Sequence, residues 1–291
     1  MLNSFKIFLI SLLEQILVSY DNSIESAREV LVKGWLDLWD GVLLFSEKLE
    51  PFCYTIIAIC LLIELAQIAM KVDLLKWEHG LKIGVKMVLS KVCIDVAPTV
   101  LKAIYTQAAD WTYSLSDDYV KMGEIFQESE IKTLVQELSG WGEVLGVFLI
   151  MVLVLIIITF AGLAVQIIAY GRIIEIYVLL VVSPIACAFF PLGDGSGGGV
   201  SRITSKYFKT FAAVSLQSVF MILCLRIFGM VMESSILEVL AKIAEDAGKE
   251  PPVPHSAQII KLATTMLLGS IVLVMSVVKS GTWAKNLLDA M

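Results

Sequence analysis

Charged residues are scarce in this sequence. Asp, Glu, Lys and Arg make up 17% of the 291 residues, whereas 58% are hydrophobic. Soluble domains carry about 25% charged residues, and a single soluble core of this size could not bury so much apolar surface. The net charge is −6, which argues against a broad basic surface of the kind that binds nucleic acid without sequence preference, although it does not exclude DNA passing nearby. The composition therefore predicts an integral membrane protein.

Residues that carry catalytic or metal chemistry are also few. The two histidines, His79 and His255, lie far in sequence from any of the five cysteines, and no two cysteines have CxxC spacing. We interpret the cysteines as small apolar side chains. No HExxH or GxSxG motif is present, and the glycine-rich "GDGSGGGVS" lacks the lysine of a G-x-x-x-x-G-K-[ST] phosphate loop. We expect no enzyme activity, no metal and no cofactor.

Long apolar runs are abundant, and each can be measured against the membrane. A helical span needs about 20 apolar residues, and only internally bonded backbone is stable in lipid. Five runs qualify: 52–70, 144–170, 173–192, 207–231 and 259–278. A sixth, 81–101, is doubtful because it contains Lys82, Lys86, Lys91 and Asp95, each costing roughly 2.5–3.5 kcal/mol at mid-membrane. The sequence predicts an all-α integral membrane protein with five or six transmembrane helices.

The N-terminal region has a different pattern. Apolar residues recur there at helical spacing, with Glu14 and Gln15 on the opposite side. The apolar stripe consists of Phe5, Phe8, Leu9, Leu12, Leu13 and Ile16. A second such pattern covers residues 21–50, where Trp35 and Trp39 suit a membrane–water interface. We expect N-terminal amphipathic helices over residues 1–51 and a polytopic transmembrane domain over residues 52–291.

Lysine and arginine counts bear on the topology, because short cytoplasmic flanks are enriched in these residues. Three flanks are basic: Lys71 and Lys76; then Arg202, Lys206 and Lys209; then Lys279 and Lys285. If 81–101 does not cross, five spans place all three flanks on one face. If it crosses, six spans put them in conflict. The counts favour five spans, and the side on which the acidic stretch 106–143 lies stays open.

The segment after the run 173–192 combines two prolines with many glycines. Pro184 lacks an N–H and clashes with the preceding turn, so the sequence predicts a kink or a break in the helix there. Pro191 and the glycines then allow a sharp turn. These glycines are Gly193, Gly195, Gly197, Gly198 and Gly199. The segment is either a plain surface turn or a contact for a partner subunit.

The residues around this segment resemble a known family. The pattern is an apolar helix ending in S-P-I-A-x-A-F-F, a basic and aromatic restart, and a helix with A-x-x-x-Q. It comprises Ser183, Pro184, Ile185, Ala186, Ala188, Phe189, Phe190, Lys206, Phe208, Lys209 and Gln217. This region, about residues 140–231, resembles the core of TrbL-type inner-membrane subunits of conjugation and type IV secretion systems.

The resemblance implies a channel subunit without catalysis of its own. It implies a multi-pass protein of the bacterial cytoplasmic membrane that forms a homo-oligomer around the translocation path. Its expected partners are the lipid bilayer, other secretion-system subunits including separate ATPases, and a translocated DNA–protein or protein substrate.

Ionisable residues inside spans are functional candidates by default. Glu64, Glu175 and Arg226 lie within the runs, and Arg172 at the edge of one can pair with Glu175 at i,i+3. We expect Glu64 and Arg226 to face the bundle interior or a subunit interface, and Gln217 to hydrogen-bond between helices. The alternative is a secondary transporter that uses Glu64, Glu175 and Arg226, although no related halves are evident.

Overall fold

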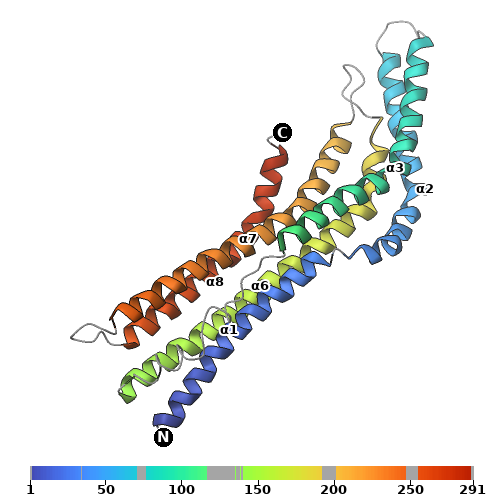
Figure 1. The fold of residues 1–291 in the computed structure, drawn as a ribbon. Helices are drawn as coiled ribbons and strands as arrows, with labels where there is room; N and C mark the ends of the chain where they lie inside the picture. The colour runs from blue at the N-terminus through green and yellow to red at the C-terminus, as the bar shows by residue number, and fades with distance from the viewer. Residues whose placement is uncertain are drawn as a thin grey trace. The chain divides into compact units, whose positions relative to one another are not determined.

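The computed structural model describes residues 2–33, 35–70, 77–116, 135, 138, 140–191, 201–246 and 255–289. Every regular element in these ranges is helical, which confirms the all-α prediction (Figure 1). The helices are α1 (Leu2–Val32), the 3-10 helix η1 (Leu36–Leu38), α2 (Trp39–Met70), α3 (Trp77–Ser116), α6 (Trp141–Ala188), α7 (Arg202–Asp246) and α8 (His255–Asp289).

Five of these helices are long and apolar enough to cross a membrane. They are Ser4–Val32, Trp39–Ala66, Trp141–Ala188, Arg202–Val239 and Ile259–Asp289. The chain is therefore a multi-pass membrane protein. Its five candidate spanning helices agree with the prediction of five or six. This set differs from the predicted runs in two ways. It includes α1, and it has one helix, α6, in place of the two runs 144–170 and 173–192.

Helix α6 joins two runs that the sequence separates. Runs 144–170 and 173–192 lie in one helix of 48 residues, which passes through Pro184 and ends at Ala188. A break at Pro184 is thus not present. Gly171 does not interrupt the helix, because a mid-helix glycine costs only about 0.5–1 kcal/mol, and Arg172 pairs with Glu175 one turn further on.

The turn beyond Pro184 is held in place by contacts at the end of α6. Cys187 and Ala188 are fully buried. The Thr204 hydroxyl donates to the Ala186 carbonyl at 2.8 Å, and the Phe190 N–H donates to the Cys187 carbonyl at 3.0 Å. Terminal helix carbonyls need such partners, and these bonds offset the one that Pro184 removes.

The chain folds as two compact units. The first consists of Met1–Val32, Thr112–Tyr170 and Val219–Ser280. In it, the ring of Phe5 on α1 packs edge-on against Phe148 of α6 at 5.2 Å. Gly162 of α6 leaves no room for a side chain, because a Cβ there would lie 2.2 Å from Ser23 of α1. The predicted stripe of α1 is its packing face: Leu9, Leu12, Leu13 and Ile16 are buried, whereas Phe8 is exposed.

The second unit consists of Lys33–Trp111, Gly171–Ser218 and Gly281–Met291. Trp39 lies at the centre of its core, stacked on Tyr105 of α3 at 5.8 Å and edge-on to Tyr177 of α6 at 6.4 Å. Trp39 is completely buried, so protein rings rather than lipid cover it, and its predicted depth at the membrane interface stays a prediction. Three aromatic rings from three helices meet here, and their stacking accounts for the position.

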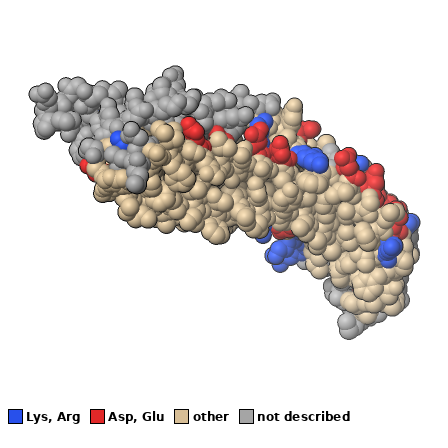
Figure 2. All heavy atoms as spheres, turned by 90° about the horizontal axis from the view of Figure 1, so that it is seen from below, with Lys and Arg blue, Asp and Glu red and all other residues tan. Residues whose placement is uncertain are grey.

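The exposed surface of the helices is mainly apolar. Figure 2 shows wide areas without a charged side chain, with acidic and basic residues lying close to one another at their edges. Along α6 the exposed side chains include Leu149, Phe160, Ile167, Ile174 and Val178. Such a surface suits lipid contact, as expected of a membrane helix.

Candidate functional site

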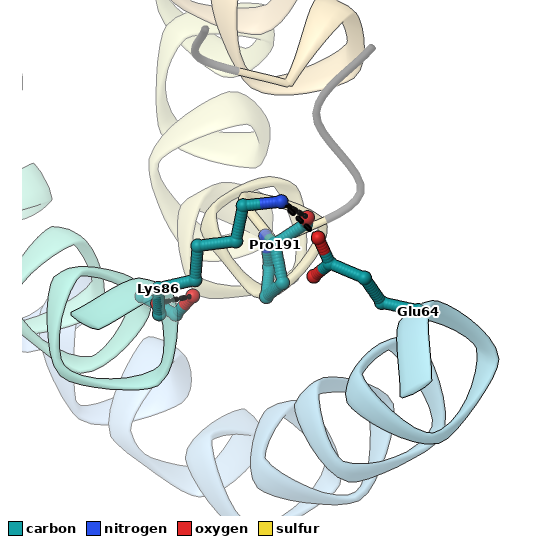
Figure 3. Close-up of polar contacts among 4 residues, drawn as sticks. Glu64, Lys86 and Pro191 are labelled. Atoms are coloured by element: carbon teal, nitrogen blue, oxygen red, sulfur yellow. Dashed lines mark hydrogen bonds and ion pairs between the residues drawn. The ribbon is translucent and has the colours of Figure 1, made fainter. Parts of the chain in front are cut away.

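An ion pair between α2 and α3 lies at the centre of the candidate site. The Lys86 ammonium donates a hydrogen bond to the Glu64 carboxylate, and also approaches the Pro191 carbonyl at 3.4 Å (Figure 3). The side chains are only 23% and 18% exposed. The pair thus connects α2, α3 and the residues just after α6, all within the second unit.

The surroundings of the pair are largely desolvated. The second oxygen of the Glu64 carboxylate is buried and has no hydrogen-bond partner among the described residues. Ser90, one turn after Lys86 on α3, is fully buried and donates to the Lys86 carbonyl at 2.7 Å. A charge in such a place depends on its partner, because a lone buried charge is strongly destabilising.

Lys86 is the functional candidate that the sequence interpretation missed. The sequence treats Lys86 as an obstacle to insertion, whereas the structure gives it a carboxylate partner. The signal that could have found it is the register of an antiparallel hairpin. Asp40 lies 4.0 Å from Lys102, Lys91 lies 3.1 Å from the Tyr54 hydroxyl, and Glu64 meets Lys86. As the residue number on α2 rises from 40 to 64, the residue number of its partner on α3 falls from 102 to 86, which is the pattern of an antiparallel hairpin.

Two further charge pairs each lie within a single helix. Arg172 forms an ion pair with Glu175 along α6, and Lys91 lies 3.5 Å from Asp95 along α3. The Lys91–Asp95 pair is half exposed, at 58% and 50% of the side-chain surface. Exposed pairs of this kind contribute at most about 1 kcal/mol. Any functional role for Arg172 or Glu175 stays a prediction.

Arg226 and Gln217 lie on α7 in different units. Arg226 lines a small cavity of about 20 Å³ together with Arg28 of α1 and Ser116 of α3, a volume that suits roughly one water molecule. Gln217 is buried against Gly281 of α8, where an added Cβ would lie 2.7 Å from the amide nitrogen. The placement agrees with helix–helix contact by Gln217, and the roles of both residues stay predictions.

The predicted loop is described only at its start. Pro184 and Pro191 are both buried, and the Pro191 carbonyl faces Lys86. Gly193, Gly195, Gly197, Gly198 and Gly199 lie outside the described residues. The predicted partner contact at this loop therefore stays a prediction.

Long apolar helices, two of which are connected by a partly buried ion pair, define a polytopic membrane protein. The family described as TrbL/VirB6 plasmid conjugal transfer like protein matches residues 37–184, from η1 to Pro184. The match covers just over half of the 291 residues, and the chain belongs to this family. A search of curated proteins and a search of solved structures found no match.

Family membership makes the chain a component of a conjugal transfer or type IV secretion system, with other subunits of that system as partners. The family is a structural part of transfer systems and is not a known enzyme family. The matched range includes α2 and α3 with the Glu64–Lys86 pair, which lie outside the region of about residues 140–231 on which the sequence resemblance rests.

Proposed function

We propose that this chain is a channel or scaffold subunit in the bacterial cytoplasmic membrane that forms a homo-oligomer around the translocation path. The observation that carries the proposal is the family match over residues 37–184, which includes the helices that hold the ion pair. The substrate of such a path is a DNA–protein complex or a protein.

Cavity sizes support a path between chains rather than through one. The two best-defined cavities in the described part of the chain have volumes of about 570 Å³ and 20 Å³. Each lies within one unit, and neither has room for a polynucleotide strand or a polypeptide in transit. Several copies placed around an axis would supply the space. Energy would come from separate ATPase subunits, since the sequence has no phosphate-binding loop with its lysine.

The continuity of α6 supports a specific topology. If α6 crosses once and α3 crosses too, the sides of the basic flanks follow from the crossings of α2, α3, α6, α7 and α8; a crossing by α1 precedes all the flanks and leaves their relation unchanged. The three basic flanks then all lie on the cytoplasmic face even though α3 crosses, and the acidic stretch 106–143 lies outside. Contacts between α2 and α3 at three levels, from Asp40–Lys102 to Glu64–Lys86, support insertion of α3 beside α2.

Secondary transport is less well supported. The alternative assigns ion or solute binding to Glu64, Glu175 and Arg226. Glu64 and Glu175 each have a basic partner of their own, Lys86 and Arg172. Carboxylates that are already paired in this way need no bound solute to balance their charge.

The mass of the purified protein separates the two functions. The full chain, extracted in mild detergent and measured by native mass spectrometry, should form a closed oligomer that is a multiple of the 32.0 kDa subunit. Proteoliposomes made with it should show no solute uptake driven by an ion gradient. A stable monomer that accumulates a solute would contradict the channel proposal and favour the transporter.

A further inference from the structure

A groove lies between α2 and α3, beside the buried cluster that packs the two helices into the second unit. Its volume is about 570 Å³. On the inner side of the hairpin, Cys53, Ile94 and Ala97 are buried, whereas Leu62 and Val88 beside the groove are about 65% exposed. The walls are apolar: Ile57, Leu61 and Leu65 from α2, and Ile83, Met87 and Val88 from α3.

The groove has a length that suits one lipid leaflet. Its wall on α2 runs from Tyr54 to Leu65, which is about 16 Å at about 1.5 Å per residue. The hydrocarbon of a bilayer is about 30 Å thick, so the groove matches the depth of a single acyl chain. In a membrane helix, an exposed apolar groove of this size is open to lipid.

One end of the groove is polar and charged. The Lys91 ammonium donates to the Tyr54 hydroxyl at 3.1 Å and lies above its ring, 5.3 Å from the centroid. Tyr54 follows Glu50 by one turn, where the charged part of α2 ends and its apolar run begins. Tyrosine and lysine prefer the level where the membrane meets water, so this end of the groove suits a lipid headgroup.

The charges at this end are complementary to a zwitterion. Asp95 lies 3.5 Å from Lys91, and both side chains are at least half exposed. An ammonium and a carboxylate side by side match a headgroup that carries a phosphate and a primary ammonium. A headgroup with only a phosphate would meet the Asp95 carboxylate unfavourably, and a quaternary ammonium has no N–H to donate to it.

We propose that the α2–α3 groove is a binding site for a phospholipid with a primary ammonium headgroup, of the phosphatidylethanolamine type. One acyl chain lies between α2 and α3, the phosphate binds Lys91, and the ammonium binds Asp95. This site depends on the location of the chain in a membrane and does not depend on the channel function.

The test uses the full-length chain in nanodiscs that contain equal amounts of three phospholipids with a photoreactive acyl chain. The headgroups are ethanolamine, glycerol and choline, and mass spectrometry quantifies labelled peptides of α2 and α3. The ethanolamine lipid should label the groove about threefold more than either competitor, the range that one exposed ion pair supplies. In Asp95→Asn this preference should disappear, while in Lys91→Gln labelling by all three should fall.

Two further variants separate a site from general lipid contact. Ala58 lines the groove and is exposed, so Ala58→Trp should fill the groove and abolish its labelling without disturbing the core. Val178 is an exposed residue on α6 of the same unit, at 56%, and Val178→Trp should leave groove labelling unchanged. Equal labelling by the three headgroups, or labelling that persists in Ala58→Trp, would overturn the proposal. So would a disulfide-linked dimer of Leu62→Cys with an unlabelled groove, which would show a second copy seated there.

Discussion

A Glu64→Leu variant should lose about 3 kcal/mol of folding free energy, because the substitution leaves the Lys86 ammonium without its carboxylate in a largely desolvated place. The lower end of the range for buried pairs applies, since the two side chains keep about a fifth of their surface exposed. Unfolding of the purified chain in mixed micelles would measure the loss. In cells, the amount of folded protein and the frequency of conjugative transfer should fall with it.

A double variant and a control make this prediction specific. In Glu64→Leu/Lys86→Met both charges are removed, so most of the lost stability should return, because apolar pairs often replace buried ion pairs without cost. The control is Glu238→Leu, which breaks an exposed i,i+4 pair with Lys242 on α7. Its expected cost is at most about 0.5 kcal/mol. If Glu64→Leu and Glu238→Leu have equal effects, the Glu64–Lys86 pair is not a structural connection.

The second large effect is an all-or-none difference in labelling across the membrane. The proposed topology places the stretch between α3 and α6 outside and the loop after α6 in the cytoplasm. In a chain whose five cysteines are replaced, Ser129→Cys should react with a membrane-impermeant maleimide in intact cells. Ser196→Cys and Lys71→Cys should react only after the membrane is permeabilised.

The comparison of Lys71→Cys with Ser129→Cys decides whether α3 crosses, since one helix separates the two positions. Labelling on opposite sides means that α3 crosses the membrane. Labelling of both positions on the same side would contradict the topology and would show that α3 does not cross. The comparison of these two labelling positions is informative whichever face of the membrane is cytoplasmic.

The sequence predicts features that depend on spacing within one helix. Arg172 and Glu175 are three residues apart, Lys91 and Asp95 are four apart, and helical geometry alone brings each pair together. The stripe of α1 from Leu9 to Ile16 follows from the same period, although the sequence could not tell whether lipid or protein covers it.

Features that depend on the register between helices could not be predicted. Glu64 and Lys86 are 22 positions apart on separate helices, and only their packing places the two charges together. Trp39 is similar, because nothing local indicates that Tyr105 and Tyr177 will enclose it. Pro184 shows the opposite problem. A proline inside a helix predicts a kink or a break, whereas α6 continues through Pro184 to Ala188, close to where Thr204 donates to the Ala186 carbonyl.

Contact between this chain and the translocated substrate during transfer tests the central claim most directly. Donor cells that carry the conjugative system would be cross-linked while transfer proceeds, and the chain would be isolated under denaturing conditions. The channel account predicts that the transferred DNA strand is recovered with the chain, and that recovery is lost when the transfer ATPases are inactive. Recovery of the strand with other subunits but never with this chain, at undiminished transfer, would contradict the account.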